Sequence, residues 1–75
     1  MNKRHSITLY DIHQRQIQLE KECGILVDLI KVYNSYTLRV SREGEETVLQ
    51  LAAATKAEAY LILDTLYQFN KTLGG

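Results

Sequence analysis

Two histidines and one cysteine are the first residues to consider, because imidazole and thiolate groups are the usual protein ligands of zinc. His5, His13 and Cys23 stand eight and ten residues apart. Neither spacing places two ligands on one helical turn, and structural zinc sites use four ligands in closely spaced pairs. We therefore expect no metal site in this chain.

Catalysis finds little support in the remaining reactive groups. Cys23 lies beside Glu20 and Glu22, rather than in the electropositive surroundings that activate a nucleophilic thiol. Three further glutamates cluster at a predicted turn, where they lack the burial that acid–base catalysis exploits. The sequence contains no Walker loop, Rossmann glycine pattern, nucleophile elbow or HExxH motif. We expect a protein that is not an enzyme and that carries no cofactor.

Arginine and tyrosine are among the residue types enriched at protein interfaces, and they supply the candidate contacts. Arg15, Arg39, Tyr60 and Tyr67 are the positions we select for binding a partner. Nucleic acid is a less favoured partner, because 9 basic and 9 acidic residues give a net charge of +0, whereas nucleic-acid binders are usually strongly basic. That alternative would use Lys3, Arg4, Arg15 and Arg39.

Length and composition limit the setting in which the protein works. A chain of 75 residues makes one small domain, residues 1–75, of which we expect residues 1–7 to be a flexible tail. A single cysteine suits a reducing compartment, and no apolar run approaches the length of a membrane span. We therefore predict a cytoplasmic protein that does not contact a membrane.

The first predicted element is a long helix over Leu9–Tyr33. Thr8 and Asp11 have the spacing of a capping box, and apolar residues recur with heptad spacing from Leu9 onward. Gly24 interrupts this helix, at a cost of about 1 kcal/mol in a helix interior. The stretch that follows is rich in β-branched residues, so a strand over residues 25–32 is the alternative.

The remaining elements are a β-hairpin and a second helix. Tyr36–Arg42 and Glu45–Ala52 alternate around Glu43-Gly44, which predicts a two-residue turn with Val40 opposite Thr47. Thr55 and Glu58 form a second capping-box pattern, which begins a helix over Lys56–Leu73. The predicted fold class is α+β with the order α-β-β-α. With a strand over 25–32, the order becomes α-β-β-β-α.

A long first helix would carry more apolar surface than one hairpin and one helix can cover. Small domains with limited cores often solve this problem by forming oligomers. We therefore predict a homodimer through the N-terminal helix. Its predicted interface consists of Ile12, Leu19, Cys23, Leu26, Ile30 and Tyr33. Pairing between edge strands of the hairpin ranks second.

These observations favour a small protein–protein interaction module that acts as a homodimer. Such a module would bind another protein as an adaptor, inhibitor or regulatory subunit, a role filled by compact accessory factors of phages and mobile elements. The alternative is a regulator associated with nucleic acid, which would use the basic residues of the N-terminus and the hairpin.

Overall fold

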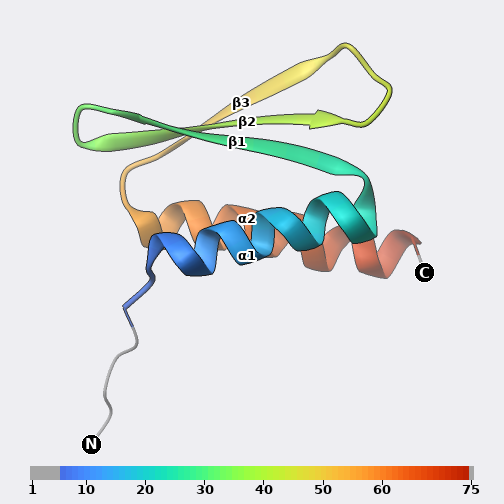
Figure 1. Ribbon diagram of the computed structural model, residues 1–75, viewed down its shortest axis with the longest axis horizontal. Coiled ribbons are helices and arrows are strands. Elements are labelled where there is room, and N and C mark those ends of the chain that lie inside the picture. Colours follow the sequence, from blue (N-terminus) through green and yellow to red (C-terminus); the bar gives the residue numbers. More distant parts are fainter. Residues whose placement is uncertain (1–5, 75) are drawn as a thin grey trace, which may run out of the picture.

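A computed structural model describes residues 6–74 of the chain as two layers, a pair of helices and a twisted antiparallel sheet (Figure 1). The elements follow the order α1 (Leu9–Gln18), η1 (Leu19–Cys23), β1 (Ile25–Val32), β2 (Ser35–Arg42), β3 (Val48–Ala53) and α2 (Lys56–Gly74). This is an α+β fold, and it matches the alternative order α-β-β-β-α. The sheet has three strands in the order β1-β2-β3.

The first helix begins as predicted and ends earlier. The Thr8 hydroxyl accepts the Asp11 backbone N–H at 3.2 Å, and the Asp11 carboxylate accepts the Thr8 backbone N–H at 2.9 Å, so the capping box is complete. α1 then continues as the π-helical turn η1, and Gly24 ends it with a left-handed φ of 68°. The prediction of a helix to Tyr33 was wrong, because Gly24 reverses the chain and a β-branched strand follows.

Replacing Gly24 with alanine is expected to lower the free energy of unfolding by about 1 kcal/mol, since a Cβ is disfavoured in the left-handed region. Space is not the obstacle, because the nearest atom to such a Cβ is the Glu43 Oε1, at 4.0 Å. Gly24→Asn should lose less, as asparagine tolerates this conformation. Urea unfolding measures both variants. Equal stability of Gly24→Ala and the wild type would contradict this role.

The hairpin of β2 and β3 keeps its predicted faces and changes its register. Val40 pairs with Leu49 and not with Thr47, and Leu38 pairs with Leu51. The Glu45 backbone N–H donates to the Arg42 carbonyl at 2.9 Å, and Gly44 has a φ of 86°, so the turn forms where predicted. β3 begins only at Val48 because glutamates, which are poor strand formers, occupy the start of the predicted strand. A shift of two residues leaves every side chain on its face.

A single apolar core joins the helices to the inner face of the sheet. Its buried members come from every element: Ile12, Leu19, Ile25, Val27, Leu38, Ala53, Ala59 and Leu63. Ile7 packs against this core, and residues 1–5 of the predicted tail lie outside the described part of the chain. The long overhanging helix is absent, since the ten-residue α1 and five-residue η1 together reach about 22 Å.

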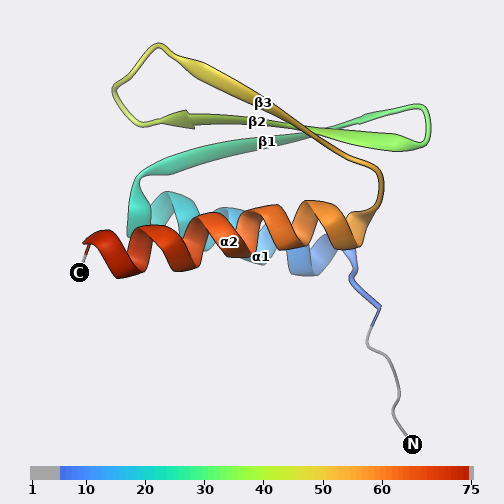
Figure 2. The same ribbon diagram turned by 180° about the vertical axis from the view of Figure 1, so that it is seen from behind.

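The two views show how the layers meet. α1 and α2 lie side by side on one side of the sheet, and α2 stands nearer the viewer in Figure 2. β1 runs back above α1 from the end of η1, and the turn between β2 and β3 is carried away from the helices by the twist of the sheet (Figures 1 and 2). The opposite face of the sheet has no covering element among residues 6–74.

Candidate functional site

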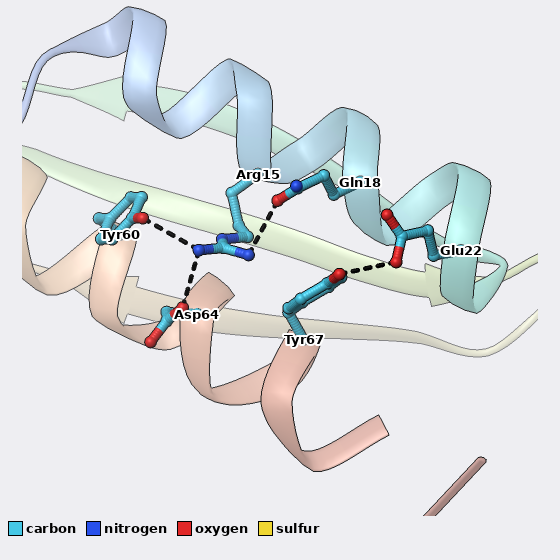
Figure 3. A network of polar contacts seen from close by, with 6 residues as sticks. All are labelled: Arg15, Gln18, Glu22, Tyr60, Asp64 and Tyr67. Atoms are coloured by element: carbon cyan, nitrogen blue, oxygen red, sulfur yellow. Dashed lines mark hydrogen bonds and ion pairs between the residues drawn. The ribbon is translucent and has the colours of Figure 1, made fainter. Parts of the chain in front are cut away.

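Arg15 is the centre of a polar cluster that joins α1 to α2 (Figure 3). Its Nη2 donates to the Tyr60 hydroxyl at 3.1 Å and pairs with the Asp64 Oδ1 at 3.0 Å. Its Nη1 donates to the Gln18 Oε1 at 2.8 Å. The guanidinium also lies 4.6 Å from the centre of the Tyr67 ring, within cation–π range. One side chain therefore contacts three residues of the opposite helix.

Tyr67 extends the cluster toward η1. Its hydroxyl donates to the Glu22 Oε1 at 2.6 Å, and the Lys71 Nζ lies 3.2 Å from the same oxygen. The Tyr67 hydrogen bond, and then the contact with Lys71, lower the pKa of Glu22 below its ordinary value. The same hydrogen bond raises the pKa of Tyr67. These contacts hold the Glu22 carboxylate in its charged form at the exposed edge of the helix pair.

The cluster stabilises the fold and leaves little for a partner. Burial disfavours the charge on Arg15, yet the Tyr60 hydrogen bond and the carboxylate of Asp64 raise its pKa above the ordinary value. The Arg15 side chain is only 16% exposed. Arg15, Tyr60 and Tyr67, which we selected for binding a partner, are thus brought together and satisfied inside the chain. Asp64, which the sequence did not single out, completes the group.

The predicted interface on the N-terminal helix divides into two parts. Ile12 and Leu19 are 0% exposed within one chain, because α2 and the sheet cover the face on which they lie. The expectation that they lack partners in their own chain was wrong, and Cys23 is half-buried against the same core. Leu26, Ile30 and Tyr33 belong to β1 and the turn after it, and they remain exposed.

These exposed residues form an apolar row on β1. Side chains alternate along a strand, and the inner positions Ile25 and Val27 are buried. Leu26, Ile30 and Val32 therefore point to the outer face, where 37%, 40% and 44% of their surfaces are exposed. Tyr33 follows directly and is 93% exposed. We call Leu26, Ile30, Val32 and Tyr33 the β1 row.

The backbone of β1 also presents hydrogen-bonding groups to the free edge of the sheet. The Glu43 N–H donates to the Gly24 carbonyl at 2.9 Å, so alternate residues from Gly24 onward bond to β2. The residues between them, Ile25, Val27, Leu29 and Lys31, direct their backbone groups away from β2. One of these groups is already satisfied, because the Gln16 Nε2 of α1 donates to the Val27 carbonyl at 2.7 Å.

Gln16 is a functional candidate that sequence reasoning did not select. The sequence did offer an indication, because Gln16 is the single polar residue at the apolar heptad positions of α1. It spans a groove of about 490 Å³ between α1 and the free edge of β1. The groove is lined by His13, Gln16, Ile17, Glu20, Leu26, Val27, Asp28 and Ser41. An extended chain that pairs with an edge strand occupies a groove of this kind.

Arg39 lies on the outer face of the sheet, directly opposite Asp28 of β1 in the register. The negative charge of the Asp28 carboxylate weakens the attraction between Arg39 and a phosphate group. Lys3 and Arg4, the other basic residues of the nucleic-acid alternative, lie outside the described residues. Arg15 does not join Arg39, since it is paired with Asp64 across the helices.

Within residues 6–74, no three His, Cys, Asp or Glu side chains are grouped so as to hold a metal ion. His5 falls outside this range. Neither described helix combines the length and apolar content that crossing a bilayer requires.

No family model, curated protein or solved structure matches this chain.

Proposed function

We propose that the protein is a small, non-enzymatic protein–protein interaction module that acts as a homodimer, with β1 in place of α1 at the contact. The observation that carries this proposal is an edge strand of eight residues with an exposed apolar row and with backbone groups directed away from β2, of which the Val27 carbonyl accepts a hydrogen bond from Gln16 of its own chain. Natural sheets usually block such edges, because they pair readily with other strands. Edge pairing, which ranked second on the sequence, thereby becomes the leading mode.

The dimer would join two sheets into one. Each copy contributes three strands, and the outer faces of both copies would form a continuous surface. Thr37, Arg39, Ser41 and Gln50 would lie on that surface and offer polar contacts to a further protein, such as one that the module recruits or inhibits. A cytoplasmic location agrees with this proposal, because Cys23 is the only cysteine.

The test is a pair of matched substitutions on the outer face of the sheet. Ile30 and Val48 are aliphatic and similarly exposed, at 40% and 44%, but Ile30 lies on the β1 edge and Val48 on β3. Light scattering at micromolar concentration should give about twice 8.6 kDa for the wild type and for Val48→Glu. Ile30→Glu should give the monomer mass. A wild-type monomer, or equal behaviour of both variants, would contradict the proposed dimer.

Nucleic-acid binding is the alternative function, and it has weaker support because Arg39 faces Asp28. A salt titration separates the two functions, since phosphate contacts weaken steeply as salt rises. Salt-dependent binding of the wild type to duplex DNA or RNA, lost in Arg39→Ala, would favour the alternative. Absence of binding at low salt would remove it.

A further inference from the structure

We propose that the groove beside β1 receives the β1 strand of a second copy, antiparallel, with Leu29 on the two-fold axis and Tyr33 at the mouth of the groove of the other copy. This inference rests on the proposed homodimer and specifies its register. Four features of the chain carry it: the edge backbone, the groove beneath that edge, the position of Asp28, and the conformation of Tyr33.

The edge backbone limits which registers can form. In an antiparallel pair, residues opposite each other either exchange both backbone hydrogen bonds or exchange none. Because Ile25, Val27, Leu29 and Lys31 face the edge, they must lie opposite one another in two symmetric copies. Two such registers use nearly the whole strand. One pairs residues 25–31 about Asp28, and the other pairs residues 26–32 about Leu29.

Asp28 decides between these registers. Pairing about Asp28 would place the two Asp28 carboxylates directly opposite each other, and like charges in that position are destabilising. Pairing about Leu29 places Leu26 opposite Val32, so exposed apolar residues of the β1 row cover each other. Asp28 then lies opposite Ile30 and keeps Arg39 of its own chain on its other side. Pairing about Asp28 would also cover Leu26, with Ile30 opposite it, so the repulsion between the two Asp28 carboxylates is what favours the Leu29-centred register.

The groove provides space for the added strand. The groove lies between α1 and β1 and has a volume of about 490 Å³. The Gln16 side chain crosses it to the Val27 carbonyl. Ile17 lines it and is 44% exposed, so it offers apolar contact to an entering side chain. In the Leu29-centred register, Lys31 of the second copy lies opposite Val27, and its backbone N–H donates to the Val27 carbonyl. A carbonyl has two lone pairs, so Gln16 can stay or be displaced.

Tyr33 supplies the fourth observation. It is the only residue other than glycine with a positive φ within residues 6–74, at 57°, a conformation that is costly for a bulky side chain. A glycine or asparagine would form this turn with less strain, yet the chain holds a tyrosine there that is 93% exposed. The Leu29-centred register places Tyr33 opposite Ile25 of the other copy, beside Leu26 at the mouth of the groove. Buried tyrosines commonly anchor interfaces.

Disulfide trapping tests the register. In a Cys23→Ser background, Leu29→Cys brings two thiols to directly opposite positions about 5.5 Å apart between Cα atoms, within the range of a disulfide. Asp28→Cys is the matched control, because the same register separates its Cα atoms by more than about 7 Å. Mild oxidation should crosslink Leu29→Cys and leave Asp28→Cys monomeric on a non-reducing gel. Circular dichroism verifies that both variants are folded.

The outcomes separate this inference from the proposed function. Crosslinking of Asp28→Cys alone, or of neither variant while light scattering still reports a dimer, overturns the register and leaves the homodimer standing. A monomeric wild type overturns both.

Tyr33→Gly provides a second test that does not depend on an inserted cysteine. Relief of the backbone strain should raise the melting temperature of the monomer, measured at low concentration. The dissociation constant of the dimer should rise tenfold or more, as for loss of an anchor residue. Tyr10→Ala is the control, because Tyr10 is also an exposed tyrosine, at 69%, and lies on α1. Unchanged dimerisation of Tyr33→Gly would contradict the role of Tyr33.

Discussion

Replacing Leu19 with alanine is expected to lower the free energy of unfolding by about 2–5 kcal/mol, the range for truncating a fully buried leucine. Leu19 is 0% exposed and belongs to the core that joins both helices to the sheet. A domain of this size has a total stability near 5 kcal/mol, so the variant should be largely unfolded under mild heating. Thermal and urea unfolding followed by circular dichroism measure the loss.

Leu61→Ala is the matched control for this prediction, since Leu61 is a leucine on α2 that is 62% exposed. It should lose less than half as much stability. Concentration provides a further distinction. A core residue lowers the stability of the monomer itself, whereas loss of an interface residue gives a deficit that depends on protein concentration. A deficit in Leu19→Ala that vanishes at high dilution would restore Leu19 to a dimer interface.

Arg15→Ala should reduce the free energy of unfolding by about 1.5–3 kcal/mol, the range for hydrogen bonds that involve a charged group. The substitution removes the contacts to Gln18, Tyr60 and Asp64, and it leaves the 34% exposed Asp64 carboxylate without its partner. For a domain of this size, the melting temperature should fall by roughly 4–8 °C per kcal/mol. Calorimetry gives the shift.

Two further variants define the cause of that loss. Arg15→Lys keeps the charge but not the planar fork that reaches several acceptors at once, so it should recover only part of the stability. Arg39→Ala removes an exposed arginine from the open face of the sheet and should change stability by less than about 0.5 kcal/mol. Equal stability of Arg15→Ala and Arg39→Ala would show that the cluster does not join the helices.

Local patterns predicted most of the elements. The Thr8–Asp11 capping box formed completely, because it depends only on residues three positions apart. At the second helix, the Thr55 hydroxyl accepts the Glu58 N–H, but the Glu58 carboxylate reaches the Ala54 N–H in place of the Thr55 N–H. The alternation of the hairpin assigned its faces correctly, since a shift of two residues preserves the side on which each side chain lies.

Gly24 shows where local patterns were insufficient. A short apolar run such as Ile25–Val32 satisfies both helical and strand interpretations, and only its pairing with β2 decides between them. Taking it as helix produced an overhang that does not exist, and this overhang placed Ile12 and Leu19 at an interface. The strand removes the overhang and adds the cover that buries both residues.

The Arg15 cluster could not be assembled from the sequence for a different reason. Arg15 and Tyr60 are 45 positions apart. No spacing rule connects residues on two helices when three strands lie between them in the sequence. Their residue types suggested contacts with another protein, whereas in the structure Arg15 contacts α2 of its own chain. Composition identifies side chains that commonly form interfaces, whereas only the three-dimensional arrangement shows what they contact.

In the sequence, α1 precedes the three strands and α2 follows them, and this order affects how the protein folds during synthesis. A ribosome extends a chain at roughly 5–20 residues per second, so the 45 positions between Arg15 and Tyr60 take about 2–9 s to synthesise. Throughout that interval the nascent polypeptide holds Ile12 and Leu19 without the helix that shelters them. Folding is therefore completed only when α2 clears the exit tunnel, and until then chaperones have access to these side chains.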